Sequence, residues 1–579
     1  MDQKRLLLAI AVSVAILLGF QLLVAPHLPH RPVPSPIATG SKPNAKAPAT
    51  ATGNAPGSVA PATPAGVAKT APRLKIAAPR LRGSISLMGA RIDDLILTDF
   101  RETLDPGSPN VRLLRPWSED QPYYVQYGWS APPGETVKVP DNDTIWTASA
   151  DTLSPGHPVT LSWDNGQGLT FQQVFAVDDD FMFTVGQSVK NSTGQPVKLS
   201  SWGRVRRGYT PQVAGYYILF EGLLGVANGT LHQLTYAKTK SEGEKLDGLA
   251  FETSTTGGWA GITDKYWLAA LVPDQSVPSR LAFRHTPEGG FQVDFVTQDA
   301  TTIAPAAAAN LQWRLFAGAK LVRLLDRYQA QYGIPSFDKA VDFGWFYFLT
   351  KPIFYCLDWL NGILGNFGLA ILAFTTFVKL LFFPLANYSY RSMSKMKLLG
   401  PKMQALRERF KDDPQKLQQE MMAMYRAEKV NPASGCLPMV IQIPVFFSLY
   451  KVIFTTIEMR QAPFFGWIHD LSAVDPTNLF NLFGLVPFDP TTISPYLQLG
   501  VWPIVMGGTM YLQQMLNPPP PDPVQARMFK FMPLIFTFML AHFPAGLVIY
   551  WTWNNLLSIA QQWFIMRRTR LTRPGLART

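Results

Sequence analysis

The sequence predicts a mixed fold: a polytopic α-helical membrane domain with six spans, an antiparallel β-sandwich domain outside the cytoplasm, and a cytoplasmic helical hairpin. Three observations lead to this prediction. Hydrophobic residues make up 47% of the 579 residues, which suits several apolar spans joined to a soluble domain. Apolar residues alternate with a period of two between residues 73 and 315. After residue 362 they form long runs that are interrupted by one basic segment.

The chain begins with a candidate membrane anchor. Lys4 and Arg5 precede an apolar run over residues 6–24, longer than the apolar core of about 7–15 residues in a typical signal peptide. We therefore expect residues 1–25 to be an uncleaved transmembrane anchor with its positive end in the cytoplasm, the alternative being a signal peptide. Residues 26–72 are rich in Pro and Ala and contain no aromatic residue, which predicts a disordered tether.

Residues 73–342 are expected to form the β-sandwich, with a helix at its C-terminal end. Alternating stretches such as Tyr123-Val125-Tyr127 are separated by turn residues such as Asp164-Asn165-Gly166. The stretch 312–332 is predicted to be a helix that leads back toward the membrane. The three histidines of this domain lack metal-ligand spacing and are expected to be ordinary residues: His157, His232 and His285.

The C-terminal half is expected to be the membrane domain. Residues 343–361 are rich in aromatic residues but contain Lys351 and Asp358, which is typical of an amphipathic helix in the membrane interface. Residues 362–566 are expected to hold five spans, with a basic cytoplasmic hairpin at 387–429. The spans are predicted at 365–384, 437–457, 496–516, 528–543 and 547–566. Both termini then lie in the cytoplasm, as does the basic tail 567–579.

One full charge, Lys379, lies inside the second span. A lysine in the middle of a membrane helix costs about 2.5–3.5 kcal/mol, and Thr375 and Thr376 share its helix face. This pattern predicts a hydrated cavity within the membrane domain. The alternative is that the lysine side chain extends to the nearer interface, and that is the interpretation we favour for Lys451 near the outer end of the third span.

The cytoplasmic segments carry two further candidate sites. Apolar residues at spacings of three and four along 387–429 predict two helices that pack along an apolar seam, with the methionines packing there or contacting apolar clients. These methionines are Met396, Met403, Met421 and Met424. The basic tail could fix topology, bind anionic lipids or bind the ribosome through Arg567, Arg568, Arg570 and Arg573.

Three stretches identify a family: EKVNPASGCLPMVIQIPVFFSLY (428–450), RQAPFFGWIHDLSAVDP (460–476) and FPAGLVIYWTWNNLLSIAQQ (543–562). They resemble the YidC-type membrane protein insertases of bacteria, which have mitochondrial and chloroplast relatives, and the resemblance extends from about residue 340 to 566. The large domain after a single anchor resembles the Gram-negative branch, so the resemblance implies a periplasmic β-sandwich and a location in the bacterial inner membrane.

The resemblance also implies a function. A hydrophilic groove open to cytoplasm and lipid would insert and help to fold nascent membrane proteins, alone or with the Sec translocon and its accessory subunits. The matching groove positions are Lys379, Thr375, Gln442, Tyr550 and Trp551, the last standing where relatives often have a second tyrosine. The ribosome and anionic lipids are expected partners, whereas DNA is not.

No enzymatic activity or cofactor is expected. The sequence contains no GxxxxGK[ST] phosphate-binding loop, and its two cysteines, Cys356 and Cys436, lie near predicted spans rather than in a disulfide framework. Three alternatives remain open. The chain could be a transporter or channel that uses the intramembrane lysine, a membrane-anchored sugar-processing enzyme built on the sandwich, or a purely structural assembly factor. Solute flux, activity of the isolated sandwich on sugars, and client insertion by the chain alone would distinguish them.

Overall fold

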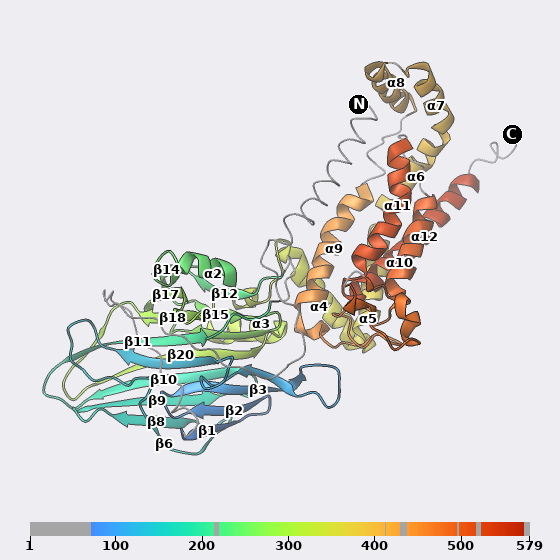
Figure 1. Ribbon diagram of the computed structural model, residues 1–579. Helices are drawn as coiled ribbons and strands as arrows, with labels where there is room; N and C mark the ends of the chain where they lie inside the picture. The colour runs from blue at the N-terminus through green and yellow to red at the C-terminus, as the bar shows by residue number, and fades with distance from the viewer. Residues whose placement is uncertain are drawn as a thin grey trace, which may run out of the picture. The chain divides into compact units, whose positions relative to one another are not determined.

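The computed structural model (Figure 1) describes residues 71–213, 219–411, 413–428, 437–494, 497–516 and 523–571. The predicted anchor at 1–25 lies outside the described residues, as do the predicted tether up to residue 70 and Arg573 in the tail. The described part of the chain consists of a β-sandwich followed by a helical half.

The β-sandwich consists of two large sheets in the described residues. The first has the strand order β14 (Leu249–Thr256), β17 (Pro278–His285), β18 (Phe291–Thr297), β11 (Val197–Arg207), β5 (Tyr123–Ser130), β3 (Arg91–Arg101), β2 (Leu81–Ser86), β1 (Arg73–Ala77) and β7 (Thr152–Leu153), with β19 (Thr301–Ile303) beside β11 and β4 (Asn110–Leu114) beside β3. The second has the order β13 (Thr230–Thr235), β12 (Gly222–Ala227), β15 (Trp259–Thr263), β16 (Trp267–Val272), β20 (Ala308–Ala319), β10 (Met182–Asn191), β9 (Leu169–Val177), β8 (Val159–Asp164) and β6 (Thr147–Ala148). Neighbouring strands are antiparallel except β1 and β7, which are parallel.

The predicted alternation produces this packing. On β9 the alternate side chains Leu169, Phe171, Gln173, Phe175 and Val177 are buried, and the residues between them are more exposed. The central pair β10–β20 places Phe183 opposite Leu315 and continues this apolar layer. The prediction of an antiparallel β-rich domain in this part of the chain is therefore confirmed.

The predicted helix at 312–332 is wrong in its first part. Residues up to Ala319 belong to β20, which pairs with β10 on one side and β16 on the other. A central strand gains hydrogen bonds along both edges, and this tertiary pairing overrides a local helical pattern. The helix α3 begins at Val322 and ends at Tyr332, where Gly333 adopts the left-handed conformation that commonly terminates helices.

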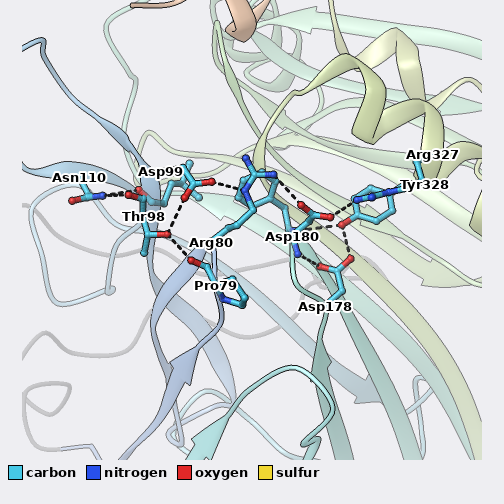
Figure 2. A network of polar contacts seen from close by, with 11 residues as sticks. Pro79, Arg80, Thr98, Asp99, Asn110, Asp178, Asp180, Arg327 and Tyr328 are labelled. Atoms are coloured by element: carbon cyan, nitrogen blue, oxygen red, sulfur yellow. Dashed lines mark hydrogen bonds and ion pairs between the residues drawn. The ribbon is translucent and has the colours of Figure 1, made fainter. Parts of the chain in front are cut away.

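A polar network fixes α3 on the sandwich (Figure 2). Arg80, between β1 and β2, forms an ion pair with Asp180 at 2.9 Å, and Arg327 of α3 binds the same carboxylate. Beside it, the hydroxyl of Tyr328 donates to Asp178 at the end of β9. Because Val322, Leu325 and Tyr328 are also buried, α3 is held by both apolar and charged contacts. The other helix of the domain, α2 (Tyr236–Gly243), packs against β14 and β17.

The helical half comes after the sandwich in the chain. Its elements are the short helix η4 (Phe337–Ala340), α4 (Tyr347–Leu364), α5 (Phe367–Leu381), α6 (Phe383–Leu398), α7 (Gly400–Arg409), α8 (Pro414–Ala427), α9 (Leu437–Thr455), the short helices η6 (Ile457–Met459), η7 (Leu479–Gly484) and η8 (Pro490–Thr492), α10 (Val501–Leu516), α11 (Pro523–Leu540) and α12 (Ala545–Leu571). Among the described residues, no single helix is long and apolar enough to cross a membrane. The bent pair formed by α5 and the first part of α6 meets that test by length and composition.

The span predicted at 365–384 differs from the structure at its end. The helix breaks at Phe382, and the chain bends by 65° between α5 and the first part of α6. Pro384 explains the break, because proline cannot donate the next helical hydrogen bond and its ring clashes with the carbonyl four residues earlier. The first part of the predicted hairpin segment is consequently α6, which packs against α12 and α9.

The hairpin itself consists of α7 and α8. Asp413 begins α8 by accepting a hydrogen bond from the Lys416 amide at 3.0 Å, and Pro414 follows at the position that tolerates proline. Leu399 and Tyr425 are buried between the helices, and the four methionines predicted for the seam pack around them.

Candidate functional site

A groove of about 560 Å³ lies within the helical half. It is lined by side chains from α5, α6, α9, α10, α11 and α12, and its walls are mainly apolar. The apolar lining residues are Met393, Ile443, Phe446, Phe447, Met510, Phe529, Met532, Pro533, Phe536 and Trp551. The polar ones are Lys379, Tyr390, Gln442, Gln513, Gln514, Tyr550, Asn554, Asn555 and Ser558.

Lys379 of α5 lines the groove and is half-buried. Its Nζ donates to Oγ of Ser558 at 2.9 Å, and that hydroxyl donates in turn to the carbonyl of Asn554 at 2.8 Å. Among the ion pairs of the described residues, none involves Lys379. The lysine is thus oriented by neutral groups of α12, so a carboxylate that entered the groove would not have to displace an acidic partner in the described part of the chain.

Gln442 of α9 and Tyr550 of α12 are hydrogen-bonded to each other across the groove. Phe446, one turn after Gln442, contacts Trp551 with ring centroids 4.6 Å apart. Pro444 lies between Gln442 and Phe446, inside α9. An amide, a phenol and an aromatic pair therefore line the same groove as Lys379.

Thr375 is placed differently from the expectation. It is buried, donates to the carbonyl of Ile371 at 2.6 Å, and is not among the residues that line the groove. Thr376 donates to the carbonyl of Leu372 at 2.8 Å and accepts from the indole N–H of Trp553 at 3.1 Å. Both threonines thus serve contacts within the helix bundle, and Lys379 is the residue of this α5 face that reaches the groove.

The sequence analysis did not single out most of the polar residues that line the groove. Tyr550, Asn554 and Ser558 recur every four residues along α12, so they share one helix face. That regular spacing was the available signal. Among the described residues, Oδ1 of buried Asn554 has no hydrogen-bond partner, while Asn555 donates to Oγ1 of Thr509 at 3.2 Å.

Lys451, which we expect to extend to the outer interface, has a charge partner within the chain. Its Nζ forms an ion pair with Asp342 at 2.7 Å, and both side chains are largely buried. Asp342 also accepts from the amide of Phe220 at 3.0 Å. A carboxylate more than a hundred residues away in the sequence therefore provides the charge partner, which a pattern within one span cannot reveal.

The remaining candidate sites are described only in part. Arg567, Arg568 and Arg570 belong to the C-terminal turns of α12, of which the structure describes the backbone course. In the described ranges, no group of three or more His, Cys, Asp or Glu side chains is arranged to hold a metal ion.

Comparisons with known proteins cover nearly the whole chain. The family model described as the YidC periplasmic domain matches residues 73–356, and the one described as the 60Kd inner membrane protein matches residues 359–572. A membrane protein insertase YidC from Granulibacter bethesdensis is 62% identical over 584 residues, covering 100% of both chains. Another from Acidiphilium cryptum is 55% identical over 509 residues, covering 86% of this chain and 85% of that protein. A crystal structure of an active YidC insertase with its first transmembrane domain resolved is similar with 17% identity and a TM-score of 0.34, covering 85% of this chain and 92% of the other.

Proposed function

The chain belongs to the YidC family of membrane protein insertases, and we propose that its groove receives the polar segment of a client that is being inserted into the bacterial inner membrane. The clients are nascent membrane proteins. Membership of the family also gives the chain its periplasmic domain. Insertion by such a groove requires neither a covalent step nor a nucleotide.

The polar tail of the client is the part that opposes insertion into the bilayer. An apolar client helix of about 20 residues gains on the order of 6–12 kcal/mol on entering the bilayer, whereas the acidic tail that must cross resists desolvation. The amides and hydroxyls that line part of the groove shorten the dry path of that tail. The client helix can then leave along the apolar and aromatic walls into lipid.

Lys379 is the observation that carries this proposal. A carboxylate at about 4 Å from its ammonium gains about 4 kcal/mol at an effective dielectric constant of 20. The neutral partner Ser558 at 2.9 Å orients the ammonium without neutralising it. The attraction is therefore available to an incoming acidic tail, and it is weak enough for release once the apolar segment enters lipid. Gln442 and Tyr550 provide further polar contacts, and Trp551 an amphipathic wall.

The proposed topology has six spans with both termini in the cytoplasm. It combines the N-terminal run at 6–24 with the five apolar segments of the C-terminal half, and α4 lies along the outer interface. The charge distribution supports it, because the hairpin and the tail are the basic segments. Helices of 15–19 residues such as α5, α10 and α9 fit this arrangement if the bilayer is thinned locally.

The proposed partners are consistent with the same arrangement. On the cytoplasmic side the hairpin methionines 396, 403, 421 and 424 contact apolar clients, and the arginine tail binds ribosomal RNA or anionic lipid in a salt-dependent manner. The Sec translocon and its accessory subunits are proposed partners from family membership, and the chain also acts alone.

The test is reconstitution of this chain alone in proteoliposomes with paired clients whose translocated tails differ only in carboxylates. Lys379→Arg should retain insertion, because the guanidinium keeps the charge. Lys379→Ala should impair the acidic client by about tenfold or more, which corresponds to about 1.4 kcal/mol, and the neutral client much less. Lys379→Glu should be worst for the acidic client.

Ser558→Ala is the matched control, because it removes the partner of the lysine but leaves the charge. It should preserve the preference for acidic tails. Equal loss of both clients in Lys379→Ala, at equal amounts of reconstituted protein, would contradict charge pairing as the mechanism.

A further inference from the structure

The segment between α9 and α10 contains an unusually apolar loop, residues 479–493, which we call the apolar loop. Leu485 is 83% exposed and Ile493 is 72% exposed, although both are large aliphatic residues. Asp489 is the one charged residue between Pro476 and Pro503 in the sequence. The exposed apolar side chains of the loop are Leu479, Phe480, Leu482, Phe483, Leu485, Val486, Phe488 and Ile493.

The base of the apolar loop is fixed by buried polar residues. Asp475 accepts from the amide of Trp502 at 2.9 Å, and Gly500 provides the space for this carboxylate, since a Cβ there would lie 2.6 Å from it. Asn478 donates to the carbonyl of Leu497 at 2.9 Å. The two ends of the loop are thus joined to each other and to the first turn of α10, so the exposed side chains project from a fixed base.

The backbone of the loop satisfies its own amides. The amides of Phe483 and Val486 donate to the carbonyls of Asn478 and Asn481 at 2.8 and 3.1 Å. Side-chain oxygens accept several others: Asn478 Oδ1 from Phe480, Asn481 Oδ1 from Gly484, and Asp489 Oδ1 from Thr491. Irregular backbone enters an apolar environment only when its polar groups are paired internally, and this loop largely meets that condition.

The loop emerges from the end of the helical half that contacts the β-sandwich. Just before its base, Ser472 accepts a hydrogen bond from the hydroxyl of Tyr266 at 3.3 Å. Arg460, after α9, donates to the carbonyl of Arg101 in β3 at 2.6 Å. Since the sandwich matches the periplasmic domain of the family, the apolar loop lies at the periplasmic end of the helices.

We infer that the apolar loop inserts into the outer leaflet of the inner membrane and anchors the periplasmic end of α10 there. This rests on the proposed function, because it uses the proposed orientation of the helices. A phospholipid leaflet is the occupant that fits best, since the exposed apolar surface continues along α10 through Val505, Leu512 and Met515. A loop of Phe and Leu without basic residues matches the boundary between headgroups and acyl chains, about 5–10 Å deep.

Such an anchor fixes one wall of the groove. Met510, Gln513 and Gln514 of α10 line the groove, so the position of α10 in the membrane sets the depth of those side chains. The loop contributes no lining residue itself among those described, and its removal should change how α10 is held rather than what the client contacts.

The test uses the full chain with Cys356→Ser and Cys436→Ser and one added cysteine, Leu485→Cys or Ile493→Cys, labelled with the environment-sensitive dye NBD. Both positions are exposed, so the label should not disturb packing. Gln167→Cys, in an exposed turn between β8 and β9, is the control. The proteoliposomes contain phospholipids spin-labelled near the headgroup or near the chain end, and client insertion is measured in the same samples.

The expected result is a blue-shifted emission at positions 485 and 493, with a larger loss of emission from the headgroup-proximal spin label than from the deeper one, and neither effect at position 167. Emission typical of water at both loop positions, in samples that still insert clients, would overturn the inference and leave the proposed function intact. Shielding of the dye without quenching by either lipid would also overturn it, in favour of a contact with protein or with a second copy of the chain.

Discussion

Glu458 is a carboxylic acid buried where the helical half meets the sandwich. It accepts from the amide of Val322, the first residue of α3, at 2.9 Å, and its second carboxylate oxygen has no hydrogen-bond partner in the part of the chain that the structure describes. Burial raises the pKa of Glu458 from 4.5 to about 7, an effect that nearby Asp358 reinforces and Arg323 opposes. Below about pH 7 the folded protein therefore favours the protonated form.

Titration of Glu458 should make the protein less stable as the pH rises toward neutrality. Between pH 4.5 and about 7 the folded protein binds this proton and the unfolded chain has lost it, so the free energy of unfolding falls as pH rises through this window. The loss is on the order of 3 kcal/mol and is complete above about pH 7. Glu458→Gln keeps the acceptor for Val322 without the charge, and we expect it to be more stable than the wild type at pH 8 and about equally stable near pH 4.5.

Thermal unfolding of the detergent-solubilised protein across this pH range measures the effect. Glu408→Gln is the control, since this carboxylate on α7 is exposed and should leave the pH dependence unchanged. Identical pH profiles for the wild type and Glu458→Gln would show that the buried carboxyl does not titrate as described.

At the residue scale, the sequence analysis named four of the residues that line the groove, Lys379, Gln442, Tyr550 and Trp551, but not the rest of its lining. Lys379 was found because a charge in an apolar run is conspicuous, and Gln442 and Tyr550 through family resemblance. Asn554 and Ser558 were overlooked because a single small polar residue adds little to the free energy of inserting a span and often serves only local packing or hydrogen bonding. Thr375 shows the reverse error, because sharing a helix face with a lysine does not decide whether a hydroxyl faces a cavity or its own backbone.

At the scale of elements, α4 is joined to α3 through Lys351. Its Nζ forms an ion pair with Asp326 of α3 at 2.8 Å and another with Asp338 of η4. Lys351→Met would leave two neighbouring carboxylates without their cation. We expect a loss of about 1–3 kcal/mol in the free energy of unfolding, less than for a fully buried pair because the lysine side chain is 19% exposed.

Thermal unfolding again provides the measurement, with two comparisons. Adding Asp326→Asn and Asp338→Asn to Lys351→Met should recover much of the loss, because the uncompensated charges are then removed. Lys245→Met, which breaks an exposed pair with Glu242, should change stability little. If Lys351→Met behaves like Lys245→Met, the ion pairs do not stabilise the attachment of α4.

Element boundaries were the least predictable part of the fold. The strand β20 was mistaken for the start of α3, because its pairing with β10 and β16 depends on residues more than forty positions away. The break at Phe382 was readable from Pro384, but the apolar composition on both sides concealed it. The alternating strands and the hairpin seam were predictable, since each arises from a local period of apolar residues.

At the scale of the whole molecule, the described residues that line the groove all come from the helical half, between Lys379 and Ser558. The buried apolar residues of the sandwich form one continuous cluster with those of the adjoining helices. The two also meet through polar contacts such as Tyr266–Ser472 and Lys451–Asp342. Because the sandwich supplies none of the described groove residues, its removal leaves the groove lining in place, provided that the connecting elements stay.

We therefore expect that deletion of residues 73–319, which removes the sandwich through the end of β20 and keeps α3 and α4, retains more than about half of the wild-type insertion of a short acidic client. The truncated chain carries Leu325→Ser, because removal of the sandwich uncovers the buried face of α3.

Deletion of residues 73–332 is the matched comparison. It also removes Asp326 and Arg323, which pair with Lys351 and Asp358 of α4, so it should lose substantially more activity. Insertion is measured in proteoliposomes at equal amounts of reconstituted protein. Loss of insertion in the first deletion, with its thermal unfolding transition still present, would show that the sandwich takes part in insertion itself.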